Sequence, residues 1–258
     1  MADRRLWSRE ELVLAFNLYL KIEFGKTHTR NKKIIDFAAL IGRTPSSVVM
    51  RLGNFASVDP YHQQRGIVGL KNGARQVQPI WDEFFADQET LLFESERILA
   101  DFEHRQLDEK YEDVLHDLKE LKGVDKVRAI KTRVNQSVFR QIVLANYSYK
   151  CAITGIDIPT LLNASHIIPW SVNDKERLNP ENGICLSPLY DKAFDVGLIS
   201  FDQDYQVLFA SKLKQKIAHE YYGKMFSPIE GVVLAAPVKY LPSKEFLEYH
   251  RDVIFNRD

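Results

Sequence analysis

The apolar residues near the start of the chain recur at the spacing of one helical face. These residues are Leu12, Ala15, Phe16, Tyr19 and Leu20. Ser8 and Glu11 have the spacing of a capping box, in which each residue satisfies a backbone amide of the other. The pattern therefore predicts a helix that begins after Ser8 and ends by Gly25.

A second apolar pattern over residues 34–41 leads to Gly42, a residue suited to terminate a helix. Thr44 and Pro45 then have the cap and first-turn chemistry of a new helix. Helix, glycine turn and capped helix form the helix-turn-helix pattern, whose second helix can read base edges. The side chains expected to be exposed on it are Ser46, Ser47, Met50, Arg51 and Asn54. A plain helical hairpin in a helical core remains the alternative.

Glycine, proline and basic residues interrupt the apolar pattern over residues 59–78, where Arg65 and Lys71 lie. We predict a loop that could follow phosphates, and then a short buried helix over residues 79–85. Residues 88–121 are predicted to form one long helix, because apolar residues recur there at heptad spacing. The seam consists of Leu107, Tyr111, Val114, Leu118 and Leu121. It favours a linker helix packed on a neighbouring domain over a dimerising coiled coil.

The pattern changes after Val127. A helix is predicted over residues 135–146, with Val138, Phe139, Ile142 and Val143 facing inward and Arg133, Gln136 and Arg140 available to a ligand. Residues 149–153 and 161–168 read as strands, 187–195 as a helix, 198–209 as a hairpin and 243–255 as a last helix. The fold class is α+β. Its domains are a helical domain (1–86), an acidic linker helix (87–126) and a second domain (127–258).

The distribution of charge along the chain bears on which kind of partner the protein binds. The formal net charge is zero, but residues 26–75 hold nine Lys or Arg against two acids. Residues 127–150 hold five Lys or Arg and no acid. Local basic blocks of this kind can bind nucleic acid although the total charge is balanced, and ordinary solvated faces are the alternative.

The cysteines limit the zinc chemistry and indicate the compartment. Cys151 and Cys185 are the only two, and no CxxC pair occurs, which excludes a structural zinc site with four cysteine ligands. So few cysteines are typical of a reducing compartment. No apolar run approaches the roughly twenty residues of a membrane span. We expect a cytoplasmic protein without structural zinc and without a membrane.

Polar residues after Cys151 have the chemistry that phosphodiester hydrolysis needs. His166 suits a general base, because imidazole titrates near neutral pH. Asn182 suits a brace whose amide bonds across to the backbone of the strand that carries the histidine. Asp191 offers an oxygen ligand for a hard divalent ion, and Asp195 lies one turn further along as a second ligand.

The motifs that contain these residues resemble the HNH endonucleases of the ββα-metal class, closest to restriction-type nucleases of bacteria. They are Phe139-Arg140, CAITG, ASHIIPW, Asn182-Gly183, LSPLYDKAFDVGLI and FLEYHRDVIF. The resemblance implies that His166 is the general base, Asn182 the middle residue, and Asp191 the residue where the family usually has a third His or Asn. Two features depart from the family: Ser165 replaces the common Asp before the first histidine, and the paired CxxC zinc motifs are missing.

The resemblance implies a metal-dependent endonuclease acting on double-stranded DNA, with Mg²⁺ the expected ion and Mn²⁺ an alternative. The N-terminal half resembles helical domains fused to such nucleases, which suggests a restriction or defence enzyme that recognises modified DNA. The expected DNA contacts are Arg43, Ser46, Ser47, Arg51, Asn54, Arg65, Lys71, Arg133, Gln136 and Arg140. A homodimer stays open. The rival functions are an inert DNA-binding regulator and an effector nuclease activated by a partner.

Overall fold

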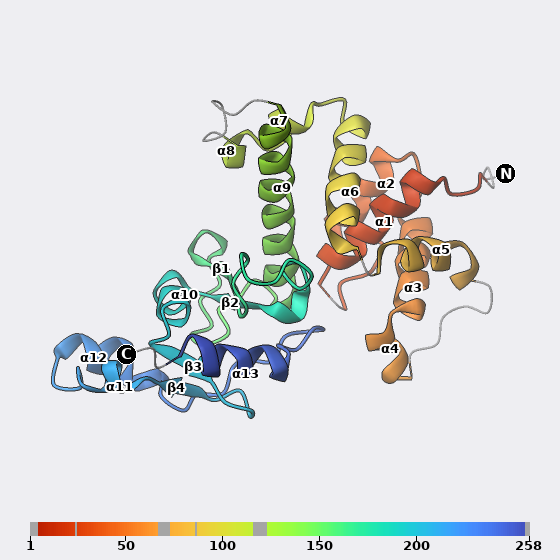
Figure 1. Ribbon diagram of the computed structural model, residues 1–258. Coiled ribbons are helices and arrows are strands. Elements are labelled where there is room, and N and C mark those ends of the chain that lie inside the picture. Colours follow the sequence, from red (N-terminus) through yellow and green to blue (C-terminus); the bar gives the residue numbers. More distant parts are fainter. Residues whose placement is uncertain (1–4, 24, 67–72, 86, 116–122, 256–258) are drawn as a thin grey trace. The chain divides into compact units, whose positions relative to one another are not determined.

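The computed structural model describes the chain in five stretches and divides it into two compact units. The described residues are 5–23, 25–66, 73–85, 87–115 and 123–255. The units are Met1–Val138 and Phe139–Asp258, and each is considered by itself. The α+β class is confirmed, because the described part of the first unit is helical and that of the second combines helices with two small antiparallel sheets (Figure 1).

Helices build the described part of the first unit. They are α1 (Arg9–Lys21), α2 (Lys32–Leu40), α3 (Pro45–Val58), α4 (Pro60–Gln64), α5 (Ala74–Phe84), α6 (Gln88–Phe102), α7 (Leu107–Lys110), α8 (Glu112–Leu115) and the first part of α9 (Gly123–Asn146). The ring of Phe16 stacks on those of Phe55 and Trp81, with 4.9 Å between ring centroids in both pairs. This aromatic core joins α1, α3 and α5.

The predicted caps form as expected. The Ser8 hydroxyl accepts a bond from the Glu11 amide, and the Glu11 carboxylate accepts one from the Ser8 amide. The Thr44 hydroxyl likewise accepts from the Ser47 amide at the start of α3. Gly42 has a φ of 65°, a left-handed conformation that favours glycine. The predicted helix, glycine turn and capped helix are therefore present, although α1 ends before Gly25.

The loop predicted over residues 59–78 is wrong at both ends. The Asp59 side chain caps α4 by accepting from the Tyr61 amide. The short helix predicted from Pro79 begins earlier, because α5 starts at Ala74 and includes that proline. Lys71 falls in 67–72, outside the described residues.

The single helix predicted over residues 88–121 is wrong as well. Helix α6 ends at Phe102, and His104 follows with a positive φ of 52°. The Tyr111 hydroxyl then lies 2.7 Å from Oε2 of Glu96, whereas one straight helix would separate the two residues by about 22 Å. The buried Glu96 carboxylate also pairs with Lys21 and Lys110. The chain turns back to this carboxylate, and Leu118 and Leu121 of the predicted seam lie outside the described residues.

The second unit begins within α9, and residue 127, where we predicted a new domain, lies inside the same helix. Its further elements are η2 (Pro159–Leu161), β1 (Asn163–His166), η3 (Pro180–Asn182), β2 (Gly183–Leu186), α10 (Pro188–Asp195), β3 (Ile199–Phe201), β4 (Val207–Phe209), α11 (Ser211–Lys214), α12 (Glu220–Met225), η4 (Ser227–Ile229) and α13 (Lys244–Val253). The strand predicted over residues 149–153 is wrong: turns occupy it, and Ser148 and Tyr149 have positive φ.

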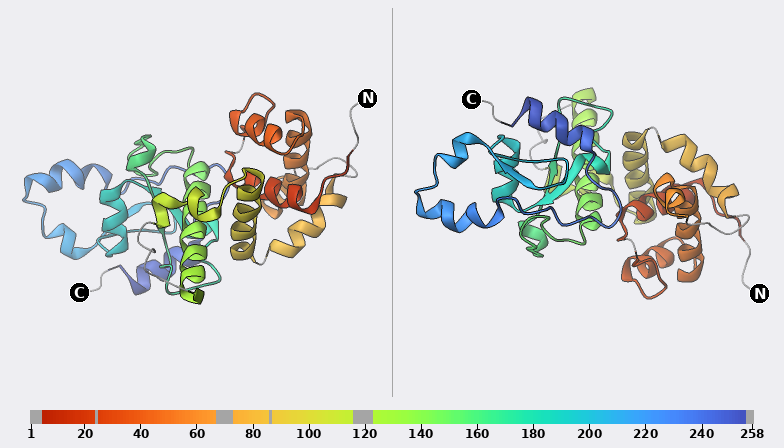
Figure 2. Two further views of the ribbon diagram at one scale, coloured as in Figure 1. Left: turned by 90° about the horizontal axis from the view of Figure 1, so that it is seen from above. Right: turned by 90° about the horizontal axis from the view of Figure 1, so that it is seen from below.

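Close packing joins β1 and β2 to α9 and α10 (Figure 2). A methyl group at Gly183 would lie 2.5 Å from Cγ2 of Val143 and 2.9 Å from Cζ of Phe139, so only glycine allows β2 to approach α9. Val138, Phe139, Ile142 and Val143 face inward as predicted. None of the helices in the described ranges combines the length and apolar character that a membrane-spanning helix needs.

Candidate active site

Two antiparallel strands and the helix after them bring the predicted site residues together. His166 ends β1 and pairs in register with Gly183, the first residue of β2. Asn182 immediately precedes β2, and Asp191 lies in the first turn of α10, which packs on β1. His166 and Asn182 therefore lie at one end of the strand pair, and Asp191 contacts β1 at its other end, through Asn163.

The bonding of His166 determines which ring nitrogen is basic. Its Nε2 lies 2.9 Å from the carbonyl oxygen of Arg177. A carbonyl can only accept, so Nε2 carries the proton and Nδ1 carries the lone pair. The ring stacks on Phe139, with 4.3 Å between centroids, and meets the edge of Trp170 at 5.5 Å. The imidazole is thereby held in one orientation and one tautomer.

Burial lowers the pKa of His166 below its ordinary 6.5, because the apolar surroundings disfavour the charged ring. The bond to the Arg177 carbonyl and the charge of Asp191 oppose this shift. The side chain remains partly exposed. The ring is therefore neutral at neutral pH, as a general base must be.

Asn182 is a fully buried brace. Its Oδ1 accepts from the Ile168 amide at 2.7 Å, and its Nδ2 donates to the carbonyls of Ile168 and Glu176, each at 3.1 Å. We predicted that this amide bonds to the backbone of the strand that carries the histidine, and its partner Ile168 lies two residues beyond the end of β1. The part of Asn182 in catalysis stays a prediction. Arg177 follows directly after Glu176. By holding the Glu176 carbonyl, Asn182 therefore also supports the neighbouring Arg177 carbonyl, which orients His166.

Asp191 is oriented by a residue that sequence reasoning did not select. Nδ2 of Asn163 donates to Oδ2 of Asp191 at 2.7 Å. Burial raises the pKa of Asp195, and the negative charge of Asp191 raises it further, which indicates that the two carboxylates lie near each other. No ion pair is found for either carboxylate in the described stretches of the chain.

The donors suit a hard divalent ion that is held weakly. Asp191 and Asp195 supply carboxylate oxygens, and Mg²⁺ characteristically binds one or two carboxylates together with water and substrate phosphate. Among the described residues, no group of three or more His, Cys, Asp or Glu side chains is arranged to hold a metal. Asp191 and Asp195 would therefore need oxygens of water and phosphate to complete the coordination.

The two cysteines lie buried and unoxidised in the core of this unit. Burial, with the nearby Cys151, raises the pKa of Cys185 to about 12. Sγ of Cys151 accepts a bond from the Ser187 amide at 3.3 Å, just before α10. The Cys185 thiol remains protonated at neutral pH, and the burial of both cysteines indicates a packing role.

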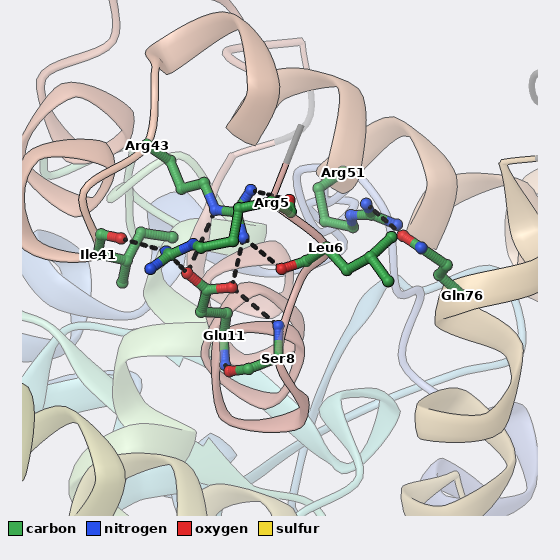
Figure 3. A network of polar contacts seen from close by, with 8 residues as sticks. All are labelled: Arg5, Leu6, Ser8, Glu11, Ile41, Arg43, Arg51 and Gln76. Carbon is green, nitrogen blue, oxygen red and sulfur yellow. Dashed lines mark hydrogen bonds and ion pairs between the residues drawn. The ribbon is translucent and has the colours of Figure 1, made fainter. Parts of the chain in front are cut away.

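Two of the predicted DNA contacts are engaged inside the first unit. Arg43 pairs with the buried Glu11 and donates to the carbonyls of Arg5 and Leu6, at 2.7 and 2.8 Å (Figure 3). Asn54 is only 8% exposed, so the prediction that it lies on the exposed face of α3 is wrong. A DNA contact by either residue would require these arrangements to change.

The other predicted DNA contacts differ in their exposure and in the contacts that their side chains make within the protein. Ser46 and Arg133 are exposed, while Ser47 and Gln136 are half-buried. Arg65 stacks on Tyr61 and bonds to its hydroxyl at 3.0 Å. Arg140 donates to the carbonyls of Pro159 and Leu162, so its guanidinium supports the chain before β1. For all of these residues a contact with DNA stays a prediction.

Sequence reasoning missed Asn163, and it did not assign roles to Trp170 or Arg177. Asn163 lies three residues before His166 in the same short strand. The family pattern instead directed attention to Ser165, the residue immediately before the histidine, where the family commonly has an aspartate. Trp170 appears in the ASHIIPW motif, but its edge contact with His166 depends on the turn after β1. Arg177 acts through its backbone carbonyl, for which a sequence carries no signal.

Comparison with known families agrees with this geometry. Residues 151–202 match the family model described as HNH endonuclease, and the match spans the strands, the brace and α10. The matched residues lie in the second unit and support nuclease activity, whereas the first unit lies outside the match. A search of curated proteins finds none that matches the chain.

Proposed function

We propose that the protein is a metal-dependent endonuclease that hydrolyses phosphodiester bonds of double-stranded DNA through a ββα-metal site. The observation that carries this proposal is the bonding of His166. Its Nε2 proton is held by the Arg177 carbonyl, which leaves a basic Nδ1 on a partly exposed ring near Asp191. A histidine that serves packing alone has no need for a free nitrogen beside a carboxylate.

Nδ1 of His166 would accept a proton from water as the water oxygen bonds to phosphorus and the bond to the 3′ oxygen breaks. Asp191, with Asp195, would hold the divalent ion, which offsets charge on the phosphorus and on the departing oxygen. Asn163 would orient Asp191. Phe139 and the Arg177 carbonyl would keep the imidazole in the productive tautomer.

The first unit would supply DNA recognition through its helix-turn-helix pattern, with α3 as the recognition helix. Helices α2 and α3 and the left-handed Gly42 between them support this proposal. Ser46, Ser47 and Arg51 on α3 would contact DNA, together with Arg65, Arg133 and Gln136. Restriction of foreign or modified DNA is the role we propose for a recognition unit joined to a nuclease domain. Pairing of two copies would place two active sites on one duplex.

Plasmid cleavage tests the nuclease proposal. The purified chain is incubated with supercoiled plasmid and Mg²⁺ or Mn²⁺, and nicked and linear products are measured on gels. Cutting should require the ion, stop in chelator and be lost in His166→Ala while DNA binding persists. His219→Ala, an exposed histidine of the same unit, is the matched control and should cut normally.

Two outcomes would favour the rival functions. Binding without cleavage under every divalent ion would favour a DNA-binding regulator, for which the absence of a three-ligand metal group in the described residues is the supporting observation. Cleavage that begins only after a partner protein is added would favour an effector nuclease. A further experiment compares cleavage of unmodified, methylated, hydroxymethylated and phosphorothioated plasmids and sequences the cut ends. This comparison tests the proposed dependence on DNA modification.

A further inference from the structure

A cluster of three arginines in the first unit contains one carboxylate, that of Glu11, among the residues that the structure describes. Arg5 and Arg43 pair with Glu11, and Arg51 lies nearby (Figure 3). The guanidinium groups of Arg43 and Arg51 also lie over the Trp7 ring. The Glu11 carboxylate accepts bonds from Arg5, from the Ser8 amide and from two nitrogens of Arg43. Glu11 is 3% exposed, so these partners occupy its oxygens. Among the described residues, one guanidinium of the three is therefore left without a carboxylate.

Arg51 is that guanidinium. Its Cζ lies 4.8 Å from the centroid of the Trp7 ring, and its Nη2 donates to Oε1 of Gln76 at 2.7 Å. Its Nε is buried and has no hydrogen-bond partner. Within the described stretches, no acidic side chain pairs with Arg51, although ion pairs are found for both Arg5 and Arg43. The pKa of Arg51 is lowered, chiefly by burial and next by the charge of Arg43.

A half-buried cation of this kind is costly unless an anion pairs with it. The planar guanidinium matches the geometry of a phosphate, and stacking on an indole ring holds it without using its donors. The neighbouring Met50 is 57% exposed and the Arg5 side chain 56% exposed, so the cluster reaches the surface. An uncharged base edge would leave the excess charge unbalanced, whereas a phosphate would neutralise it.

We propose that Arg51 binds a backbone phosphate of DNA, with Trp7 and Gln76 holding its guanidinium in place and Glu11 holding Arg43 beside it. This inference rests on the proposed DNA substrate but on no part of the cutting chemistry. It also changes the role expected for Arg51 on α3, from reading base edges to a contact that is independent of sequence. Such a contact fixes the register of the helix on DNA without specifying bases.

The test measures equilibrium binding of the full chain carrying His166→Ala, so that cutting cannot interfere. Affinity is determined on two duplexes of unrelated sequence over a series of salt concentrations. Arg51→Gln should weaken binding to both duplexes by roughly tenfold, as expected for the loss of one charge-assisted contact. The slope of log affinity against log salt should fall in magnitude by about 0.9. Arg51→Lys should fall between, because it keeps the charge but loses the planar fork.

Arg97→Gln is the matched control, because this arginine of α6 is exposed and makes no contact that the structure records. It should bind like the parent. Thermal melting separates binding from a structural role: removal of an unbalanced half-buried charge should leave the melting temperature of Arg51→Gln unchanged or higher. A melting temperature that falls together with affinity would assign Arg51 a structural role and overturn the proposal.

The remaining outcomes are also decisive. Parent-like affinity and salt slope in Arg51→Gln would reject the phosphate contact alone and leave the proposed function standing. A loss confined to one of the two duplexes would show base recognition and overturn the assignment to phosphate. If the parent binds neither duplex, the proposed DNA substrate fails and this inference fails with it.

Discussion

Two histidines of the second unit have closely similar surroundings but opposite chemical prospects. His166 stacks on Phe139 and His250 stacks on Phe194, and Nε2 of each donates to a backbone carbonyl. Nδ1 of His250 also accepts a bond from the Ser200 hydroxyl at 3.0 Å, and the residue is 1% exposed. Among the described residues no such partner is recorded for Nδ1 of His166, and this histidine stays partly exposed within the influence of the Asp191 charge.

The difference teaches that stacking and a carbonyl bond do not identify a general base. Burial lowers the pKa of His250 to about 4, so this ring is neutral at neutral pH. Both of its nitrogens have hydrogen-bond partners in the core. Burial also lowers the pKa of His166, but there the residue stays partly exposed and Nδ1 keeps its lone pair. The open nitrogen and the nearby carboxylate, more than the pKa alone, distinguish a candidate catalyst from a core residue.

The largest expected effect comes from His166→Ala. Loss of a general base should reduce the rate of plasmid cutting by about a hundredfold to ten-thousandfold. Because this side chain is only partly buried, melting should change little. Gel assays of cutting and thermal melting, run together, measure the two effects. Cutting at the parent rate would contradict the assignment of the base.

His250→Gln should instead change how stability depends on pH. In the unfolded chain this histidine binds a proton below its ordinary pKa of 6.5, whereas the folded protein resists protonation down to about pH 4. Stability is therefore present above 6.5 and is lost as the pH falls toward 4, by about 3 kcal/mol at the lower limit.

The measurement for His250 is urea unfolding of parent and variant at about pH 7 and about pH 5. The parent should lose more stability than His250→Gln over this interval, because the variant lacks the group that titrates. Equal losses in the two proteins would show that His250 does not determine the acid sensitivity. The cutting rate per folded molecule should match that of the parent near neutral pH.

Asn163→Ala should have a smaller effect on cutting. It removes the donor to Oδ2 of Asp191, and the loss of one such bond corresponds to roughly tenfold in rate. The concentration of Mg²⁺ needed for half-maximal cutting should rise, because the carboxylate is no longer oriented. Gln215→Ala, which changes an exposed side chain in the same unit, is the control. A rate and metal requirement equal to those of the parent would remove Asn163 from the site.

The acidic limit of cutting should shift modestly. Since burial lowers the pKa of His166, the neutral base persists below pH 6.5, and the rate should decline only at lower pH. Phe139→Leu removes the stacked ring and should move this decline toward higher pH by less than about one unit. The pH profile of single-turnover cutting measures the limit. A limit above 6.5 in the parent would contradict the direction of the shift.

The smallest effect is expected at Ser165, and a second buried serine, Ser200, provides the contrast. The Ser165 hydroxyl beside His166 is buried without a hydrogen-bond partner, so Ser165→Ala should be nearly neutral or slightly stabilising. Ser200→Ala should cost about 1–3 kcal/mol, because it leaves Nδ1 of His250 buried without a donor. Urea unfolding measures both. A large loss in Ser165→Ala would indicate a bond that the static structure does not record.

Local sequence rules worked wherever a few neighbouring residues decide the structure. The caps at Ser8 and Thr44 and the turn at Gly42 form as predicted, because each depends on bonds within a few residues. The prediction of a long helix over residues 88–121 failed because a distant partner prevailed. The buried Glu96 carboxylate binds both Tyr111 and Lys21. A heptad pattern describes only the spacing of apolar residues, so it does not predict these contacts.

By itself, the sequence determined the α+β class, the helix starts after Ser8 and Thr44, and the order in which His166, Asn182 and Asp191 occur. Those features follow from short-range bonding and from residue chemistry, which a linear pattern preserves. Only the tertiary structure decided that Asn163 orients Asp191 and that the Arg177 carbonyl selects the tautomer of His166. It also decided that Arg51 lacks a carboxylate partner in the described chain. These outcomes depend on which donors and acceptors reach each other after folding.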